Sequence, residues 1–414
     1  MSSPADARAG TLDELRRVIR RIESARPPRP APEPVEAIVG GEVVDTAVGS
    51  LIVVRREYPL AHRHGRLALG EARGVPRHLV DVIARQGEAP ADVGRLLFLD
   101  TETTGLAGGT GTYAFLVGAG WIEDERFVVV QHFIRDFDEE PALLAALEPL
   151  LAGASGVVTF NGTGFDVPLL ETRFIMARKR WPMALCHVDL LRAARRVWAT
   201  RLDDCRLATL EREVLGLVRE DDVPGALIPT LYFDFLRYRR AGPLARVFAH
   251  NRADVLSLAT LLGWFTRALE ADAAALHAEE LGGLGRLFEP LDLERAIAYY
   301  RAALAAGLDG PGADWVRLRL ALWAKRRAEW EAACALWQAS TTARVFDVRP
   351  WEELAKYHEH RRRDAAAARG IVVEALALAH AAAASRGVVE ALAHRLARLD
   401  RRLGSAVVPL TARE

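Results

Sequence analysis

Two carboxylates separated by one residue, Asp100 and Glu102, are the side chains best placed to do chemistry. They follow an apolar run at residues 96–99, which predicts a buried strand over residues 95–100. Side chains two positions apart on a strand share a face, and two adjacent carboxylates repel each other. A divalent cation removes that repulsion, and oxygen ligands favour Mg²⁺ or Mn²⁺. The alternative is a strand end with two solvated acids.

A second polar segment ends in Asp166. Residues 157–165 are typical of a strand, a polar turn and the start of a helix. Asp166 is therefore either a helix N-cap or a third metal ligand. In the same segment, Asn161 has an amide that can donate to a phosphate or a base. Phe165 has a ring that can stack on a base or pack against the protein.

A third segment places His250 four residues before Asp254, ahead of an apolar helix over residues 255–262. At this spacing both side chains lie on one helix face. A histidine beside a metal-binding aspartate can act as a general base, because its pKa lies near working pH. The alternative is an ordinary His–Asp pair at the start of a helix.

The elements that must position these residues follow an α/β pattern. Three consecutive strands followed by alternating helices and strands predict a mixed β-sheet flanked by helices, which we assign to residues 91–272. Strands are predicted at residues 95–100, 113–121, 127–134, 156–160 and 185–188, and helices at 141–151, 167–178, 203–214, 231–240 and 244–270.

The chain before this domain divides into two parts. Residues 1–35 predict an N-terminal helix and a proline-rich linker. Residues 36–90 form an N-terminal extension, with strand-like runs at 42–48 and 51–55 and a helix near 78–85.

The chain after the domain, residues 280–400, is predicted to be all-α. Alanines at 296, 333 and 367 recur at spacings of 37 and 34, and a large apolar residue follows each one four positions later. This period is typical of tetratricopeptide-like helix pairs, and we expect such a region to bind a protein partner. An ordinary alanine-rich helical bundle is the alternative.

Composition bounds the class of protein. The 414 residues include 55 basic and 55 acidic side chains, so a zero net charge gives no overall attraction to nucleic acid. Three cysteines without a CxxC pair argue against a disulfide scaffold or a structural zinc site. No stretch reaches the roughly 18 apolar residues of a membrane span. We therefore expect a cytoplasmic protein without membrane contact.

Taken together, the three segments resemble a known group of nucleases. Residues 98–106 resemble the first motif of the DEDD exonuclease superfamily, as in the proofreading subunit of bacterial replicases. Residues 161–166 and 250–254 resemble its second and third motifs, in the same order. Residues 108–118, 159–174 and 205–211 are similar to the YprB-type RNase H-like family, whose members often carry C-terminal tetratricopeptide repeats.

The resemblance implies a metal-dependent 3′–5′ exonuclease. It would cleave single-stranded DNA or RNA by two-metal phosphodiester hydrolysis, with two Mg²⁺ or Mn²⁺ ions. The implied metal ligands are Asp100, Glu102, Asp166 and Asp254, the implied general base is His250, and the implied substrate contacts are Thr103, Leu106, Asn161 and Phe165.

One departure concerns the base. The histidine branch of the superfamily usually places its histidine five residues before the last aspartate, whereas His250 precedes Asp254 by four, as the tyrosine branch does. Two other functions remain open from the sequence. One is an RNase H-like endonuclease. The other is a non-catalytic nucleic-acid-binding adaptor that uses its helical repeats for protein interaction.

Overall fold

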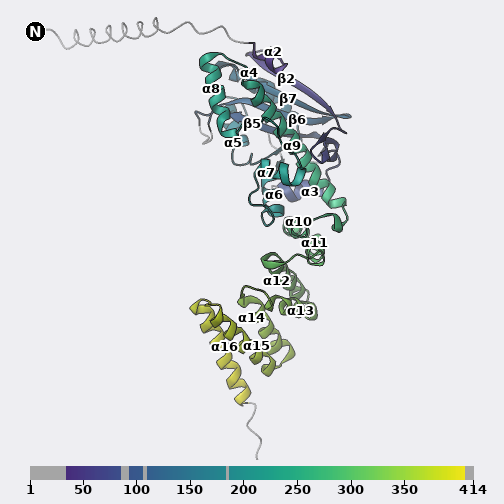
Figure 1. Ribbon diagram of the computed structural model, residues 1–414, viewed down its shortest axis with the longest axis vertical. Coiled ribbons are helices and arrows are strands. Elements are labelled where there is room, and N and C mark those ends of the chain that lie inside the picture. Colours follow the sequence, from purple (N-terminus) through teal and green to yellow (C-terminus); the bar gives the residue numbers. More distant parts are fainter. Residues whose placement is uncertain (1–33, 85–92, 106–109, 183–185, 406–414) are drawn as a thin grey trace, which may run out of the picture. The chain divides into compact units, whose positions relative to one another are not determined.

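The computed structural model describes residues 34–84, 93–105, 110–182 and 186–405 (Figure 1). These residues form two compact units. The sheet unit comprises the described parts of Met1–Arg77, Gln86–Asp189 and Glu211–Trp264, and the helical unit comprises those of His78–Arg85, Leu190–Leu210 and Phe265–Glu414. Of the helix and linker predicted for residues 1–35, residues 1–33 lie outside the described residues.

The sheet unit is built on a mixed seven-stranded sheet, which confirms the predicted fold class. Strands β5, β8 and β9 are parallel, and the other pairings are antiparallel. The order across the sheet is β1-β2-β7-β6-β5-β8-β9. The strands are β1 (Glu42–Thr46), β2 (Gly49–Pro59), β5 (Leu96–Thr103), β6 (Ala114–Glu123), β7 (Arg126–Phe133), β8 (Gly156–Thr159) and β9 (Cys186–Asp189).

Two strands of the predicted N-terminal extension belong to this same sheet. β2 pairs with β7 from Ile52 opposite Phe133 to Pro59 opposite Arg126, and β1 pairs with β2 at the outer edge. A separate two-stranded sheet joins β3 (Arg63–His64) to β4 (Leu67–Ala68). The extension thus completes the sheet on one side.

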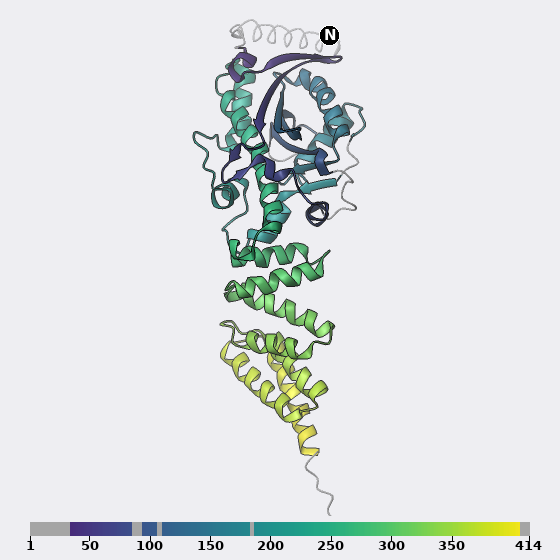
Figure 2. The same cartoon turned by 90° about the vertical axis from the view of Figure 1, so that its right-hand side faces the viewer.

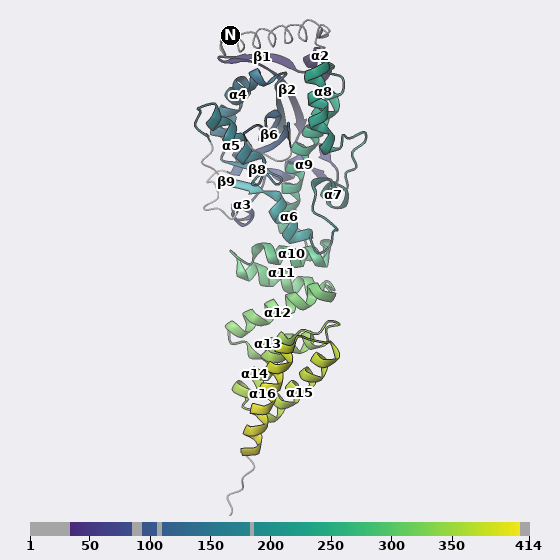
Figure 3. The same ribbon diagram turned by 90° about the vertical axis from the view of Figure 1, so that its left-hand side faces the viewer.

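Helices cover the sheet on both faces (Figures 1 and 3). Residues Leu97 and Leu99 of β5 join a buried core that contains residues of α4 and α5. Asp100 lies on the opposite face of β5, because side chains alternate along a strand, and α9 lies there. The α-helices of this unit are α2 (Val35–Val39), α4 (Glu140–Gly153), α5 (Asp166–Met176), α8 (Ile228–Tyr238) and the part of α9 (Leu244–Glu270) that ends at Trp264.

Two glycines of β6 let α9 approach closely. Gly118 lies opposite Asp100, and a Cβ added there would come within 2.3 Å of Asn251 Oδ1. At Gly120 a Cβ would come within 2.6 Å of Val255. Missing side chains on β6 therefore create the space in which the polar face of α9 reaches β5.

The helical unit contains antiparallel helices that follow one another in sequence (Figure 2), which confirms the predicted all-helical region. Its helices are α3 (Arg77–Ala84), α6 (Leu190–Trp198), α7 (Leu207–Leu210), α10 (Ala278–Phe288), α11 (Leu293–Ala305), α12 (Gly310–Arg326), α13 (Trp330–Thr341), α14 (Val348–Lys356), α15 (Ala365–Ala381) and α16 (Arg386–Ser405). None of the helices described in either unit is long and apolar enough to cross a membrane.

The three small-and-large pairs noted in the sequence differ in burial. Ala296 and Ala333 are fully buried, and the large residues four positions after them, Tyr300 and Trp337, are also buried. Ala367 is half-buried, whereas Ala368 and the residue four positions later, Val372, are buried. The tetratricopeptide type of these helix pairs stays a prediction.

Candidate active site

Asp100 and Glu102 both lie on β5, which extends three residues beyond the predicted strand end. The two carboxylates are on the face toward α9. The pairing of β5 with β6 shifts by one residue between Glu102 and Thr103, because Phe115 of β6 has no partner on β5. A bulge in β6 therefore lies opposite the end of β5, directly after the second carboxylate. Bulges redirect the residues that follow them and often occur next to active sites.

A polar relay holds Asp100 from behind. Asn251 of α9 donates through Nδ2 to the Asp100 carboxylate at 2.8 Å and to its backbone carbonyl at 3.2 Å. Gln131 of β7 in turn donates to Asn251 Oδ1 at 2.9 Å and to the Phe248 carbonyl at 2.8 Å. Every hydrogen bond of this relay joins buried or half-buried groups. The relay therefore fixes the position of the Asp100 side chain. Neither Gln131 nor Asn251 was singled out from the sequence.

Asp166 is the first residue of α5 and is buried. Its Oδ1 accepts a hydrogen bond from Thr101 Oγ1 at 2.5 Å, so it lies beside β5. Burial raises the pKa of the Asp166 carboxyl to about 6, although the Thr101 hydrogen bond opposes the shift. Asp166 lies at the start of the helix, as the N-cap interpretation predicts, but it does not occupy the N-cap position itself. Phe165, and not Asp166, is the residue just before the helix.

Asp189, at the end of β9, organises the turn that precedes Asp166. Its carboxylate accepts hydrogen bonds from the backbone N–H groups of Asn161 at 2.8 Å and Thr163 at 3.2 Å, and from the Thr163 hydroxyl at 2.6 Å. The turn needs this support because Asn161 has a φ of +66°. Sequence reasoning missed Asp189, although an acidic residue directly after an apolar strand is a usable signal.

His250 and Asp254 lie one turn apart on α9. His250 Nδ1 is 2.7 Å from the carboxylate of Asp222, and its Nε2 is 3.5 Å from Asp254 Oδ2. The Asp222 contact directs the other ring nitrogen toward Asp254. Asp222 belongs to an irregular segment before α8, and no pattern in the sequence marked it.

Arg219, from the same irregular segment, places a cation beside the carboxylates. Its Nη2 donates to Asp254 Oδ1 and to Glu211 Oε1. Glu211 lies in a π-helical turn, Glu211–Leu215, and is buried. No motif in the sequence pointed to Arg219, because its place is set by tertiary contacts alone.

The four predicted carboxylates interact electrostatically. Burial raises the pKa of Asp100 well above its usual range, and repulsion from Asp254, Glu102 and Asp166 adds to the shift. Burial likewise raises the pKa of Glu102, with repulsion from Asp254 and Asp166, while Arg219 opposes it. Acidic groups from β5, α5 and α9 are therefore gathered into one region of high negative potential.

The donor chemistry of this region fits divalent cations. In the described part of the chain, no three histidine, cysteine, aspartate or glutamate side chains are gathered closely enough to hold one metal ion. However, Glu102 Oε1 is buried and accepts no hydrogen bond from any described residue. An unpartnered buried carboxylate oxygen costs free energy unless a cation or donor reaches it. The set consists of oxygen donors only, which suits Mg²⁺ or Mn²⁺.

The predicted substrate contacts differ in how exposed their side chains are. Thr103 is buried, and its hydroxyl donates to the Gly105 carbonyl at 2.9 Å. Asn161 is exposed and Phe165 is half-buried, so both side chains remain accessible. Leu106 lies outside the described residues.

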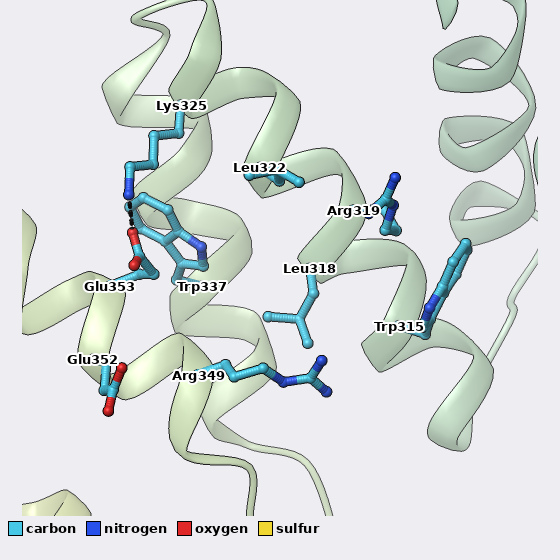
Figure 4. Close-up of a pocket in the computed structure, with 9 residues that line it drawn as sticks. All are labelled: Trp315, Leu318, Arg319, Leu322, Lys325, Trp337, Arg349, Glu352 and Glu353. Atoms are coloured by element: carbon cyan, nitrogen blue, oxygen red, sulfur yellow. Dashed lines mark hydrogen bonds and ion pairs between the residues drawn. The ribbon is translucent and has the colours of Figure 1, made fainter. Parts of the chain in front are cut away.

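A separate cavity of about 330 Å³ lies in the helical unit between α12, α13 and α14 (Figure 4). Trp315, Leu318 and Trp337 give it apolar walls, and Arg349 reaches across it. Lys325 forms an ion pair with Glu353 at its rim. The cavity thus has apolar walls, and charged side chains that line it, Lys325 and Arg349 among them, already form ion pairs.

Comparison with known proteins agrees with this architecture. Residues 97–266 match a domain model of the RNase H superfamily. The chain is also 33% identical over 360 residues to "Uncharacterized protein YprB" of Bacillus subtilis (strain 168), an alignment that covers 84% of this chain and 85% of that protein. Because this identity extends over most of both proteins, the chain belongs to the YprB family and carries an RNase H superfamily domain.

Proposed function

We propose that the sheet unit is a metal-dependent 3′–5′ exonuclease that trims single-stranded DNA or RNA into mononucleotides. One observation carries this proposal most strongly. Carboxylates from β5, α5 and α9 interact in one region, and burial together with their mutual repulsion raises the pKa of Asp100 and Glu102. Such an arrangement costs folding free energy and is the kind of site that two-metal phosphodiester hydrolysis requires.

In this proposal, Asp100, Glu102, Asp166 and Asp254 hold two Mg²⁺ or Mn²⁺ ions. When bound, such ions supply an activated water and charge stabilisation for the leaving 3′ oxygen. Asn251 and Thr101 keep two of the carboxylates in place through the hydrogen bonds described above.

His250 is the proposed general base. It accepts the proton of the attacking water at Nε2, because Asp222 engages Nδ1. This arrangement supports the role of His250 despite its four-residue spacing from Asp254. Thr103, Leu106, Asn161 and Phe165 are the proposed contacts to the terminal nucleotides.

The test is incubation of the full chain with Mn²⁺ and a 5′-labelled single-stranded oligonucleotide of DNA or RNA. We expect a ladder that shortens from the 3′ end. Asp100→Asn should abolish it, whereas Asp45→Asn, an exposed aspartate of β1, should not. Internal cuts would favour an RNase H-like endonuclease instead.

A metal-binding measurement distinguishes the adaptor function from the nuclease function. Calorimetry should detect Mn²⁺ binding to the wild-type chain and weaker binding to Asp100→Asn. If no binding occurs at millimolar Mn²⁺, a non-catalytic adaptor becomes the better proposal. In either case we propose that the helical unit binds a protein partner. The apolar walls of its cavity support this.

A further inference from the structure

Arg219 is anchored independently of the proposed metal ligands. Its Nη2 donates to Glu211, which is 2% exposed. The same Glu211 oxygen accepts from the Ser257 hydroxyl, and Ser257 Oγ lies 2.8 Å from His64 Nε2. The guanidinium is thus held from behind by a buried network, which remains intact whatever happens at Asp254.

The guanidinium also has donors that no strong acceptor uses. Arg219 Nε is buried, and no described residue accepts a hydrogen bond from it. Nη1 lies 3.4 Å from His250 Nδ1 and 3.6 Å from Asp222, which are long contacts. An arginine carries five N–H donors, and a buried donor without an acceptor costs free energy. The guanidinium of Arg219 therefore has donor capacity that a further anion could use.

Arg219 and a bound metal ion would both contact the Asp254 carboxylate. Its Oδ1 accepts from Arg219 Nη2, and the same carboxylate is a proposed metal ligand. A divalent cation held by this carboxylate repels the guanidinium and weakens the bond between Arg219 and Asp254. The bond of Arg219 to Glu211 does not involve a proposed metal ligand and is not weakened in this way.

We propose that Arg219 binds a phosphate oxygen of the substrate, and that it exchanges Asp254 for this phosphate as the site is loaded. The proposal rests on the proposed nuclease function. A planar guanidinium donates to two phosphate oxygens at once, which an ammonium group cannot do with the same geometry. Arg219 is then a catalytic residue that touches the substrate and balances negative charge at the phosphate.

The test measures product binding, not turnover. Adenosine 5′-monophosphate is titrated calorimetrically into the full chain at a fixed, saturating Mn²⁺ concentration. Arg219→Gln should bind it roughly tenfold or more weakly, the effect expected for one lost hydrogen bond to a charged group. Arg219→Lys keeps the positive charge but loses the planar guanidinium that donates to two phosphate oxygens. It should therefore bind the nucleotide more weakly, whereas its Mn²⁺ affinity should stay near that of the wild type.

Arg246→Gln is the matched control. Arg246 bonds to the backbone carbonyls of Asp221 and Asp222, so it contacts the same irregular segment without touching the proposed metal ligands. It should leave nucleotide affinity unchanged.

Equal nucleotide affinity of the wild type and either folded Arg219 variant would overturn this inference. If the wild type still trims oligonucleotides, the proposed function would then stand without it. A wild-type chain that binds no Mn²⁺ would overturn both.

Discussion

At the level of single residues, Asn251 determines how Asp100 is presented. Its amide donates to Asp100 and accepts from Gln131, so its two ends cannot be exchanged without breaking both bonds. An amide at this position adds no charge to a region that already holds four carboxylates. That combination of donor, acceptor and neutrality is specific to asparagine and glutamine.

Asn251→Asp tests this role, because it changes shape very little. The new carboxylate would face Asp100 and lose the donor, so the free energy of unfolding should fall by about 1–3 kcal/mol in a chelating buffer near neutral pH. Urea unfolding measures the change. Asn161→Asp, on an exposed turn, should have little effect, and equal losses in both variants would contradict the relay.

Residue types and their spacing point to the four carboxylates and His250 as candidates but not to the groups that hold them. Asp100 and Glu102 follow an apolar strand, which is a local signal. Arg219 has no such signal, since its segment has no regular structure and its partners are Glu211 and Asp254. Hydrogen-bond partners between distant segments depend on the tertiary fold and cannot be read from a single sequence.

At the level of elements, the close packing of α9 on β6 depends on Gly118. Gly118→Ala would place a Cβ against Asn251, so it should cost about 1–3 kcal/mol of unfolding free energy and displace Asp100. Thermal unfolding and the oligonucleotide assay measure the two effects. Gly225→Ala is the control, because a Cβ there has no atom within 4 Å. A stable, fully active Gly118→Ala would refute the packing argument.

His132 of β7 makes the stability of the sheet depend on pH. Burial lowers the pKa of His132 from 6.5 to about 4. Between these values the unfolded chain binds a proton that the folded chain does not. The contribution of neutral His132 to the unfolding free energy is therefore fully present above pH 6.5. It is lost as the pH falls toward 4, by up to about 3 kcal/mol.

His132→Gln should remove this part of the dependence. We expect the unfolding free energy of the variant to change less between pH 6.5 and pH 4.5 than that of the wild type, as measured by urea unfolding at several pH values. His64 should keep a similar dependence in both proteins, because burial also lowers its pKa to about 4. If the unfolding free energy of both proteins changed equally with pH, His132 would not contribute to the pH dependence of stability.

Element boundaries were largely predictable from periodicity. The helix predicted at residues 244–270 has these limits in the structure, because apolar residues recur along its whole length. The strands at 42–48 and 51–55 were also predicted, but not the pairing of the second strand with β7. This pairing joins residues from 67 (Pro59 and Arg126) to 81 (Ile52 and Phe133) positions apart. Alternation along one strand gives no information about its neighbour.

At the level of the whole molecule, the helical unit depends on small residues between its helices. Ala368 is fully buried, whereas Ala367 is half-buried. Ala368→Leu should therefore lower the unfolding free energy by about 1–3 kcal/mol through overpacking, and Ala367→Leu should be tolerated. Thermal unfolding followed by circular dichroism compares the two variants. The opposite ranking would show that Ala367, and not Ala368, packs between the helices.

The pairing of β2 with β7 has a consequence for how the protein can be divided. A fragment that starts at residue 91 would retain the family match but lose the neighbour of β7, a strand whose residues are buried except the first. Its row of free N–H and C=O groups would then be an open template for other copies, and such edges promote aggregation. The limits of the match to the RNase H domain model are therefore not the limits of a fragment that avoids aggregation.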